Sequence, residues 1–107
     1  MASPTQRSLA HARTEGWTAA ITEHWNHYAH IRQDLLGWID LLVLRDGEIV
    51  GVQTTSGSNH AARRTKILAS PTYEAWRRAG GKAEVWTWAK RGPRGKRKVW
   101  TLRVESL

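Results

Sequence analysis

One acidic residue stands in the most apolar stretch of this chain. Asp40 interrupts the segment 38–44, whose sequence WIDLLVL otherwise predicts a strand buried on both faces. Burying a carboxylate costs several kcal/mol of desolvation unless a partner or a metal ion compensates for it. Asp40 is therefore the first candidate for a functional group.

The residues that follow place two further polar groups beside this carboxylate. Asp46-Gly47 is a dipeptide preferred in two-residue hairpin turns, where both central residues need positive φ. A turn at this dipeptide sets Asp40 directly opposite Gln53, and Thr55 lies two residues further along the same face. An acid, an amide and a hydroxyl are thus expected to meet within an apolar sheet.

Such a group of oxygen donors suits a hard divalent cation. Mg²⁺ or Mn²⁺ takes oxygen ligands, and Mg²⁺ keeps several waters, so one or two carboxylates, a carbonyl oxygen and a substrate phosphate are enough. Asp40 and Gln53 are the expected metal ligands, and together with Thr55 they form the expected catalytic centre. The alternative is a buried hydrogen bond between Asp40 and Gln53 that only fixes the strand register.

Two more acids are candidates for the same site. Asp34 precedes the apolar segment, and Gly37 would allow the chain to bend between Asp34 and Asp40. Glu23 falls on the apolar face of an alternating segment at 17–25. Either acid could be a further metal ligand, and the alternative for Glu23 is an ion pair with a nearby arginine.

A turn of small residues leads from the strand of Gln53 into a basic helix. Free backbone amides at the start of a helix attract anions, and cationic side chains follow within two turns. The candidate phosphate contacts are Ser56, Ser58, Asn59, Arg63, Arg64 and Lys66. The alternative is a capped and solvated basic helix.

A particular set of elements must hold these residues. Ser3-Pro4 predicts a helix that ends near Glu15, before Gly16. The other expected elements are a strand at 17–25, a polar loop at 26–34, a hairpin of strands at 37–45 and 48–55, helices at 60–68 and 71–79, and strands at 83–90 and 99–104. We expect one α+β domain over 1–107, with helices packed on a mixed sheet, because the crossover helix lets the strand after it rejoin the sheet in parallel.

The charge of the chain favours a polyanionic partner. Seventeen lysines and arginines against nine acids give a net charge of +8 and a pI near 10.9, which suits nucleic acid. The segment 90–98 predicts a hairpin tip that contacts DNA, and a solvated loop is the alternative. The candidate contacts are Lys90, Arg91, Arg94, Lys96, Arg97 and Lys98. Trp86, Trp88 and Trp100 beside it are expected to pack in the sheet rather than to stack on bases.

Several other kinds of chemistry find no support in the sequence. The chain has no cysteine, which excludes disulfide and thiolate chemistry, and no nucleotide fingerprint indicates an organic cofactor. His24, His27 and His30 lack an evident fourth ligand, so loop histidines are expected rather than a zinc site. The first residues lack the apolar core of a signal peptide and no stretch could span a bilayer, so we expect an intracellular, cytoplasmic protein without a membrane partner.

The motif around Asp40 resembles that of a known superfamily. An aspartate in an apolar strand, a tight turn and then the segment 51–56 (GVQTTS) are similar to the motif of PD-(D/E)XK nucleases, closest to small archaeal and phage members of the Holliday junction resolvase type. The segments 32–40 and 53–59 also look like a group of small phage and actinobacterial proteins, so a phage-encoded chain is expected. The resemblance covers roughly 5–90 and implies a restriction-endonuclease-like core with elements in the order αβββαβ.

The resemblance implies a role for each matching residue. Asp40 takes the place of the metal-binding aspartate. Gln53 stands where the motif usually has Glu or Asp, and Thr55 stands where it has Lys. A neutral Gln53 is a weaker ligand, which leaves Asp34 or Glu23 to supply a second charge.

The activity implied by the resemblance is Mg²⁺-dependent hydrolysis of DNA by a structure-selective endonuclease. Lys66 or Arg63 on the following helix would replace the missing lysine, and Arg32 in the matching segment is a further candidate DNA contact. Symmetric cutting of branched DNA needs two sites, which implies a homodimer. The alternatives are an inactive DNA-binding module on the same fold and a small basic RNA-binding protein.

Overall fold

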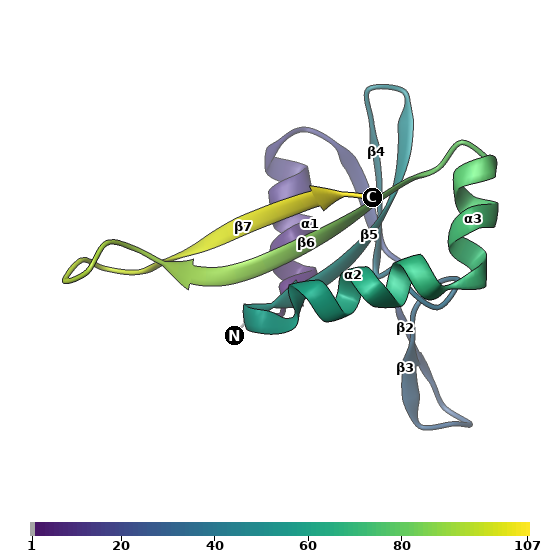
Figure 1. Ribbon diagram of the computed structural model, residues 1–107, viewed down its shortest axis with the longest axis horizontal. Helices are drawn as coiled ribbons and strands as arrows, with labels where there is room; N and C mark the ends of the chain where they lie inside the picture. Colours follow the sequence, from purple (N-terminus) through teal and green to yellow (C-terminus); the bar gives the residue numbers. More distant parts are fainter. Residues whose placement is uncertain (1) are drawn as a thin grey trace.

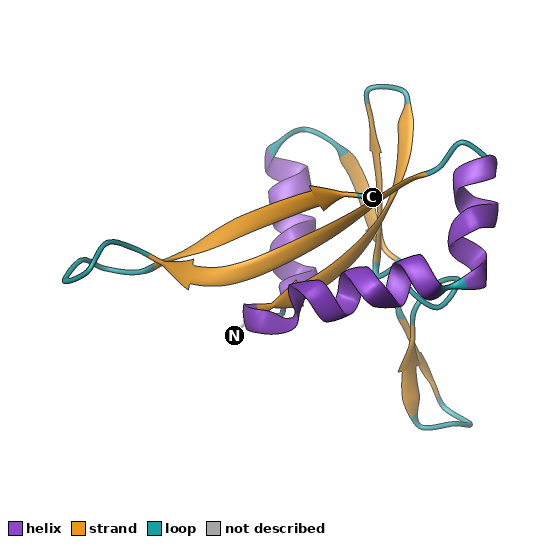
Figure 2. Ribbon diagram, in the orientation of Figure 1, coloured by secondary structure: helices purple, strands orange, loops and turns teal. Residues whose placement is uncertain are grey.

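The computed structural model describes residues 2–107, which form one α+β unit of helices and strands (Figures 1 and 2). The helices are α1 (Pro4–Thr14), the 3₁₀ turn η1 (Gly57–Asn59), α2 (His60–Ala69) and α3 (Pro71–Arg78). The strands are β1 (Thr18–Ile21), β2 (His24–Asn26), β3 (Ile31–Gln33), β4 (Leu41–Arg45), β5 (Glu48–Ser56), β6 (Lys82–Arg91) and β7 (Val99–Ser106).

A mixed sheet of five strands forms the centre of the protein, in the order β1-β4-β5-β6-β7. β5 and β6 run parallel, and the other three neighbouring pairs are antiparallel. The parallel pair follows from the crossover through α2 and α3, which returns the chain to the starting end of the sheet. The expected α+β class and the mixed sheet are therefore confirmed.

Helices cover the sheet on two sides (Figure 2). α1 packs on one face through a core that includes Ala12, Leu41 and Trp86. Ser3 caps this helix, because its hydroxyl accepts a hydrogen bond from the Gln6 N–H at 3.1 Å. α2 and α3 pack on the other face, where Ile67 joins a second core.

The turn between β4 and β5 has the predicted geometry. Asp46 and Gly47 both adopt positive φ, of 49° and 77°. The register runs from Arg45 opposite Glu48 to Leu41 opposite Val52. The predicted pairing, which sets residue 40 against residue 53, is confirmed by this register.

The first predicted strand is wrong in part. The segment 17–25 divides into β1, which pairs with β4, and β2, which leaves the sheet. The chain leaves after Ile21 because the Thr22 N–H and the Glu23 N–H both turn to the Asp40 carbonyl, at 2.9 and 3.4 Å. Alternation alone could not show where one strand stops and the next begins.

The polar loop predicted at 26–34 is also wrong. Its second half forms β3, and β2 and β3 make a separate two-stranded hairpin that projects from the body of the protein (Figure 1). Asn26 fixes the turn, because its side-chain oxygen accepts hydrogen bonds from the Tyr28 and Ala29 N–H groups at 2.9 and 3.0 Å.

The strand predicted from residue 37 begins only at Leu41. Leu36 and Gly37 take positive φ, of 56° and 84°, and turn the chain before it joins the sheet. Trp38 and Ile39 lie outside β4 but stay fully buried, because they pack in the core between the sheet and the helices α2 and α3. Gly51 makes room for both side chains, since a Cβ atom at this position would lie 3.0 Å from each of them.

Strands β6 and β7 are longer than predicted, and their far ends reach beyond the body of the protein as a two-stranded arm (Figure 1). The tip of this arm is the basic segment 90–98, whose side chains are all exposed. The predicted hairpin tip is confirmed as a structure, and its contact with DNA stays a prediction.

Candidate metal centre

Three carboxylates from separate parts of the chain meet at one end of the sheet. Asp40 lies just before β4 and is 4% exposed, Glu23 lies between β1 and β2, and Asp34 follows β3. One oxygen from each lies within 4.8 Å of the others. The structure therefore brings together all three acids that the sequence offered.

The β2–β3 hairpin explains why the two outer acids reach Asp40. Glu23 and Asp34 occupy the two ends of this hairpin, so its pairing brings them toward each other. The carbonyl of Asp40 holds the first end through the Glu23 N–H. The turn at Leu36 and Gly37 holds the second end, because the Gly37 N–H donates to the Asp34 carbonyl at 3.1 Å.

Gln53 and Thr54 contact the same carboxylate from β5. The Asp40 Oδ2 atom accepts hydrogen bonds from Gln53 Nε2 at 2.5 Å and from the Thr54 N–H at 3.0 Å. The other atom of the amide, Gln53 Oε1, is buried and has no hydrogen-bond partner. Among the buried side-chain nitrogen and oxygen atoms of residues 2–107, it is the only one without a hydrogen-bond partner. Buried polar atoms are usually paired, so this atom requires an explanation.

The electrostatics of the cluster disfavour a full set of negative charges. Burial, a hydrogen bond with Asp34 and the charges of Asp34 and Glu23 raise the pKa of Asp40 to about 8, against a smaller opposite effect of the Thr54 N–H. Three carboxylates at this spacing repel one another unless protons or a cation compensate.

The acids open into a pocket of about 320 Å³ that is mainly polar. Residues at the start of α1 form one wall, and residues from the end of β5 to α2 form the other. The lining residues are Pro4, Thr5, Glu23, Asp34, Asp40, Gln53, Thr54, Thr55, Ser56, Asn59 and Arg63. Thr55, Ser56 and Asn59 thus lie where the sequence placed them, beside the acids.

Arg63 is the one basic side chain among the described residues that line this pocket. Lys66 lies on the far side of Asp34, where its Nζ atom is 3.2 Å from Asp34 Oδ2. Arg32 lies 3.8 Å from Glu23 on the same side, in a neighbouring cavity of about 480 Å³. Lys66 and Arg32 therefore flank the acids, and Arg63 is the cation placed inside the pocket.

The other predicted contacts, which are Arg64, Ser58 and the arm residues, do not line the acidic pocket. The guanidinium of Arg64 pairs with Glu105 at 2.9 Å, away from the pocket. Ser58 is exposed within η1 and does not line the pocket. The Asn59 side-chain amide donates a hydrogen bond to the Ser56 carbonyl at 3.0 Å. The arm residues lie beyond the body of the protein (Figure 1).

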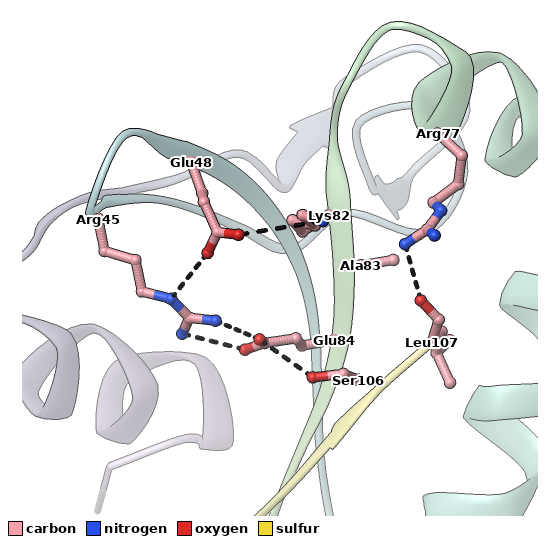
Figure 3. Close-up of a pocket in the computed structure, with 8 residues that line it drawn as sticks. All are labelled: Arg45, Glu48, Arg77, Lys82, Ala83, Glu84, Ser106 and Leu107. Carbon is pink, nitrogen blue, oxygen red and sulfur yellow. Dashed lines mark hydrogen bonds and ion pairs between the residues drawn. The ribbon is translucent and has the colours of Figure 1, made fainter.

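A second cavity, of about 250 Å³, lies at the opposite end of the sheet (Figure 3). It also contains charged side chains, and most of them form ion pairs with one another. Arg45 pairs with Glu84 and with Glu48, and Lys82 lies 4.0 Å from Glu48. These pairs fix β4, β5 and β6 to one another, and Arg77, the remaining cation of the lining, donates a hydrogen bond to the Leu107 carbonyl at 2.9 Å.

The sequence predicted that three histidines lie in a loop, and this holds for His27 and His30 but not for His24, which lies in β2. His24, His27 and His30 fall on the β2–β3 hairpin. Within residues 2–107 the only group of three or more potential metal ligands is the acidic one.

Comparison with protein-family models, with curated proteins and with solved structures gives no match. Between residues 2 and 107, none of the helices has the length and apolar character needed to cross a bilayer.

Proposed function

We propose that this protein is a metal-dependent endonuclease that hydrolyses phosphodiester bonds in DNA. One observation carries the proposal: Glu23, Asp34 and Asp40 converge in an open pocket beside a buried amide oxygen that has no partner. The net charge of +8 supports a nucleic-acid substrate.

The residues present fit a hard divalent cation. The three carboxylates offer oxygen ligands, which Mg²⁺ and Mn²⁺ prefer. The Gln53 amide lines the same pocket with its Nε2 atom toward Asp40, so a turn of the amide would offer Oε1 as a neutral ligand. Asp40, Asp34 and Glu23 would hold the ion. Once bound, it would polarise the scissile phosphate and lower the pKa of an attacking water.

The chain itself would position the phosphate. Arg63 lies inside the pocket, where its guanidinium would bear charge that develops on the phosphoryl oxygens. Thr55 cannot take the part of a lysine, because it carries no cation. Lys66 would be a positioning residue, because its hydrogen bond to Asp34 would orient that carboxylate toward the cluster.

The order of the elements supports a nuclease of the PD-(D/E)XK type. α1, β1, β4, β5, α2 and β6 follow the αβββαβ order that the sequence resemblance implies. The β2–β3 hairpin is then an insertion between the first two strands, α3 extends the crossover after α2, and β7 is an addition at the end. Holliday junction resolvase-like activity on branched DNA, by a homodimer with two such sites, is the form of the proposal that the resemblance favours.

A second candidate function is a DNA-binding module on the same fold without catalysis. Gln53 and Thr55 favour it, because an amide and a hydroxyl replace the acid and the lysine of the usual motif. An RNA-binding protein would share the positive charge but has no need of the acidic pocket. Metal dependence separates the first proposal from both alternatives.

The decisive test is cleavage of a labelled four-way junction and of a matching linear duplex, with Mg²⁺, Mn²⁺ or EDTA. We expect cutting that requires the metal and is abolished in Asp40→Asn, while DNA binding changes only a few-fold. Glu74→Gln, at an exposed acid on α3, is the matched control and should cut normally. Tight binding without cleavage under any metal would favour the non-catalytic module.

A further inference from the structure

A further pocket, lined mainly by apolar groups, adjoins the acidic one. Its volume is about 350 Å³, and Pro4 and Ser56 belong to the walls of both pockets. Its lining residues are Ala2, Ser3, Pro4, Arg7, Ser56, Trp88 and Trp100. A ligand in the acidic pocket could therefore extend into it without crossing the body of the protein.

Two tryptophans give this pocket its character. Trp88 is nearly buried, and its indole N–H is already used in a hydrogen bond to Ser8 Oγ at 2.9 Å. Trp100 of β7 is 38% exposed, so part of its large ring is open to solvent. The sequence predicted packing for both rings, and the structure bears this out for Trp88 while leaving Trp100 partly open.

Positive charge surrounds the exposed ring. The Arg7 guanidinium lies 3.9 Å from the centroid of Trp100, and the Lys90 ammonium lies 5.5 Å from it. Lys90 is also the first residue of the basic arm tip. Because the Arg7 guanidinium lies over the Trp100 ring, a planar base would stack on the guanidinium plane or on the exposed part of the indole, and the two cations offer its phosphate a counter-charge.

We propose that this pocket binds an unpaired nucleobase of the DNA strand whose phosphate lies at the acidic cluster. The position of the phosphate at the acidic cluster rests on the proposed nuclease function. Binding of the base itself needs no metal. A base inside a duplex is stacked and paired, so a pocket of this kind selects DNA with unpaired nucleotides next to the cleavage site. The substrate class is then single-stranded or branched DNA rather than continuous duplex.

The test compares binding of a fluorescent oligothymidine with binding of a duplex of equal length, in EDTA, by fluorescence anisotropy. Trp100→Leu keeps an apolar side chain on β7 but removes the aromatic face, and we expect it to weaken single-strand binding about tenfold and duplex binding less than about twofold. Trp100→Phe keeps a ring and should stay within about threefold of the wild type. Trp25→Leu, at a tryptophan on the β2–β3 hairpin that is 46% exposed, is the matched control and should bind normally.

Equal losses for single strand and duplex in Trp100→Leu would overturn the proposal, because they would indicate a general effect on the surface. A loss no larger than that of Trp25→Leu, or wild-type protein that does not bind the single strand, would overturn it as well. All these binding measurements are made without metal, so they do not depend on cleavage. If the protein shows the predicted binding pattern but never cleaves DNA, the base pocket is supported and the nuclease proposal is not.

Discussion

Asp40 contacts three kinds of group: two carboxylates, a buried amide and a backbone N–H. The sequence predicted its burial and its contact with Gln53, because a hairpin with a defined turn fixes which residues face each other. It also marked Asp34 and Glu23 as candidates. It could not predict that these two acids lie beside Asp40, because their position depends on the β2–β3 hairpin. The only local signal for that hairpin is the turn formed by Asn26.

The raised pKa of Asp40 makes the stability of the metal-free protein depend on pH. The unfolded chain loses this proton near pH 4, whereas the folded protein keeps it up to about pH 8. Stability from this group is thus complete at low pH and is lost as the pH rises through that window. We expect the melting temperature in EDTA to fall by about 10–15 °C between pH 5 and pH 8.

Thermal unfolding of Asp40→Asn supplies the control for this pH dependence. The amide cannot ionise, so the fall should be much smaller in this variant. The pair of His60 with Glu105 is present in both proteins, so any pH dependence that it adds is common to the two profiles. Identical pH profiles for the two proteins would contradict the assigned cause.

Arg63 and Arg64 allow a matched comparison between adjacent residues. Arg63 lines the acidic pocket, whereas Arg64 pairs with Glu105 outside it. We expect Arg63→Gln to lower the cleavage rate about 10²-fold, because it removes a cation from the reacting phosphate. Arg64→Gln should cut nearly as fast as the wild type, and equal effects of the two changes would place the phosphate elsewhere.

At the scale of elements, the β4–β5 hairpin and the helices were predictable and the β2–β3 hairpin was not. Asp46-Gly47 and the proline-led helix starts are local signals, and local signals set these elements. The alternation at 17–25 continued across the point where the chain leaves the sheet, so one predicted strand covered two real ones. That boundary is set by the carbonyl of Asp40, a contact distant in sequence.

Gly51 tests how tightly the segment before β4 is held. A Cβ atom there would press on Ile39 Cδ1 and on the Trp38 ring, both fully buried. We expect Gly51→Ala to lower the free energy of unfolding by about 1–3 kcal/mol in urea titrations. Adding Ile39→Val removes one of the contacting atoms and should recover part of the loss, whereas a purely additive double variant would argue against this contact.

At the scale of the whole molecule, the basic segment 90–98 lies at the tip of an arm that reaches beyond the body of the protein (Figure 1). In the proposed function, this arm would contact the DNA backbone while the reaction occurs at the acidic pocket. Composition alone predicted a polyanionic partner, and the turn residues predicted the exposed tip. The length of the arm depends on how far β7 follows β6, which no local pattern fixes.

The arm should set the salt dependence of DNA binding. Removal of one cation that neutralises a phosphate of duplex DNA reduces the slope of log affinity against log salt by about 0.9. We expect Arg94→Gln with Arg97→Gln to weaken binding at low salt and to lower the slope by about 2. Arg77→Gln with Arg78→Gln removes the same charge from α3 and should leave the slope nearly unchanged, and the reverse ranking would move the DNA surface to α3.

The most direct measurement of the central claim is calorimetric titration of Mn²⁺ into the metal-free protein, beside Asp40→Asn and the control Glu74→Gln. The acidic cluster predicts binding that is lost in Asp40→Asn, kept in Glu74→Gln and stronger at higher pH, because the ion replaces a proton. Absence of binding in the wild type, or equal binding in Asp40→Asn, would contradict the assignment of Glu23, Asp34 and Asp40 as a metal centre.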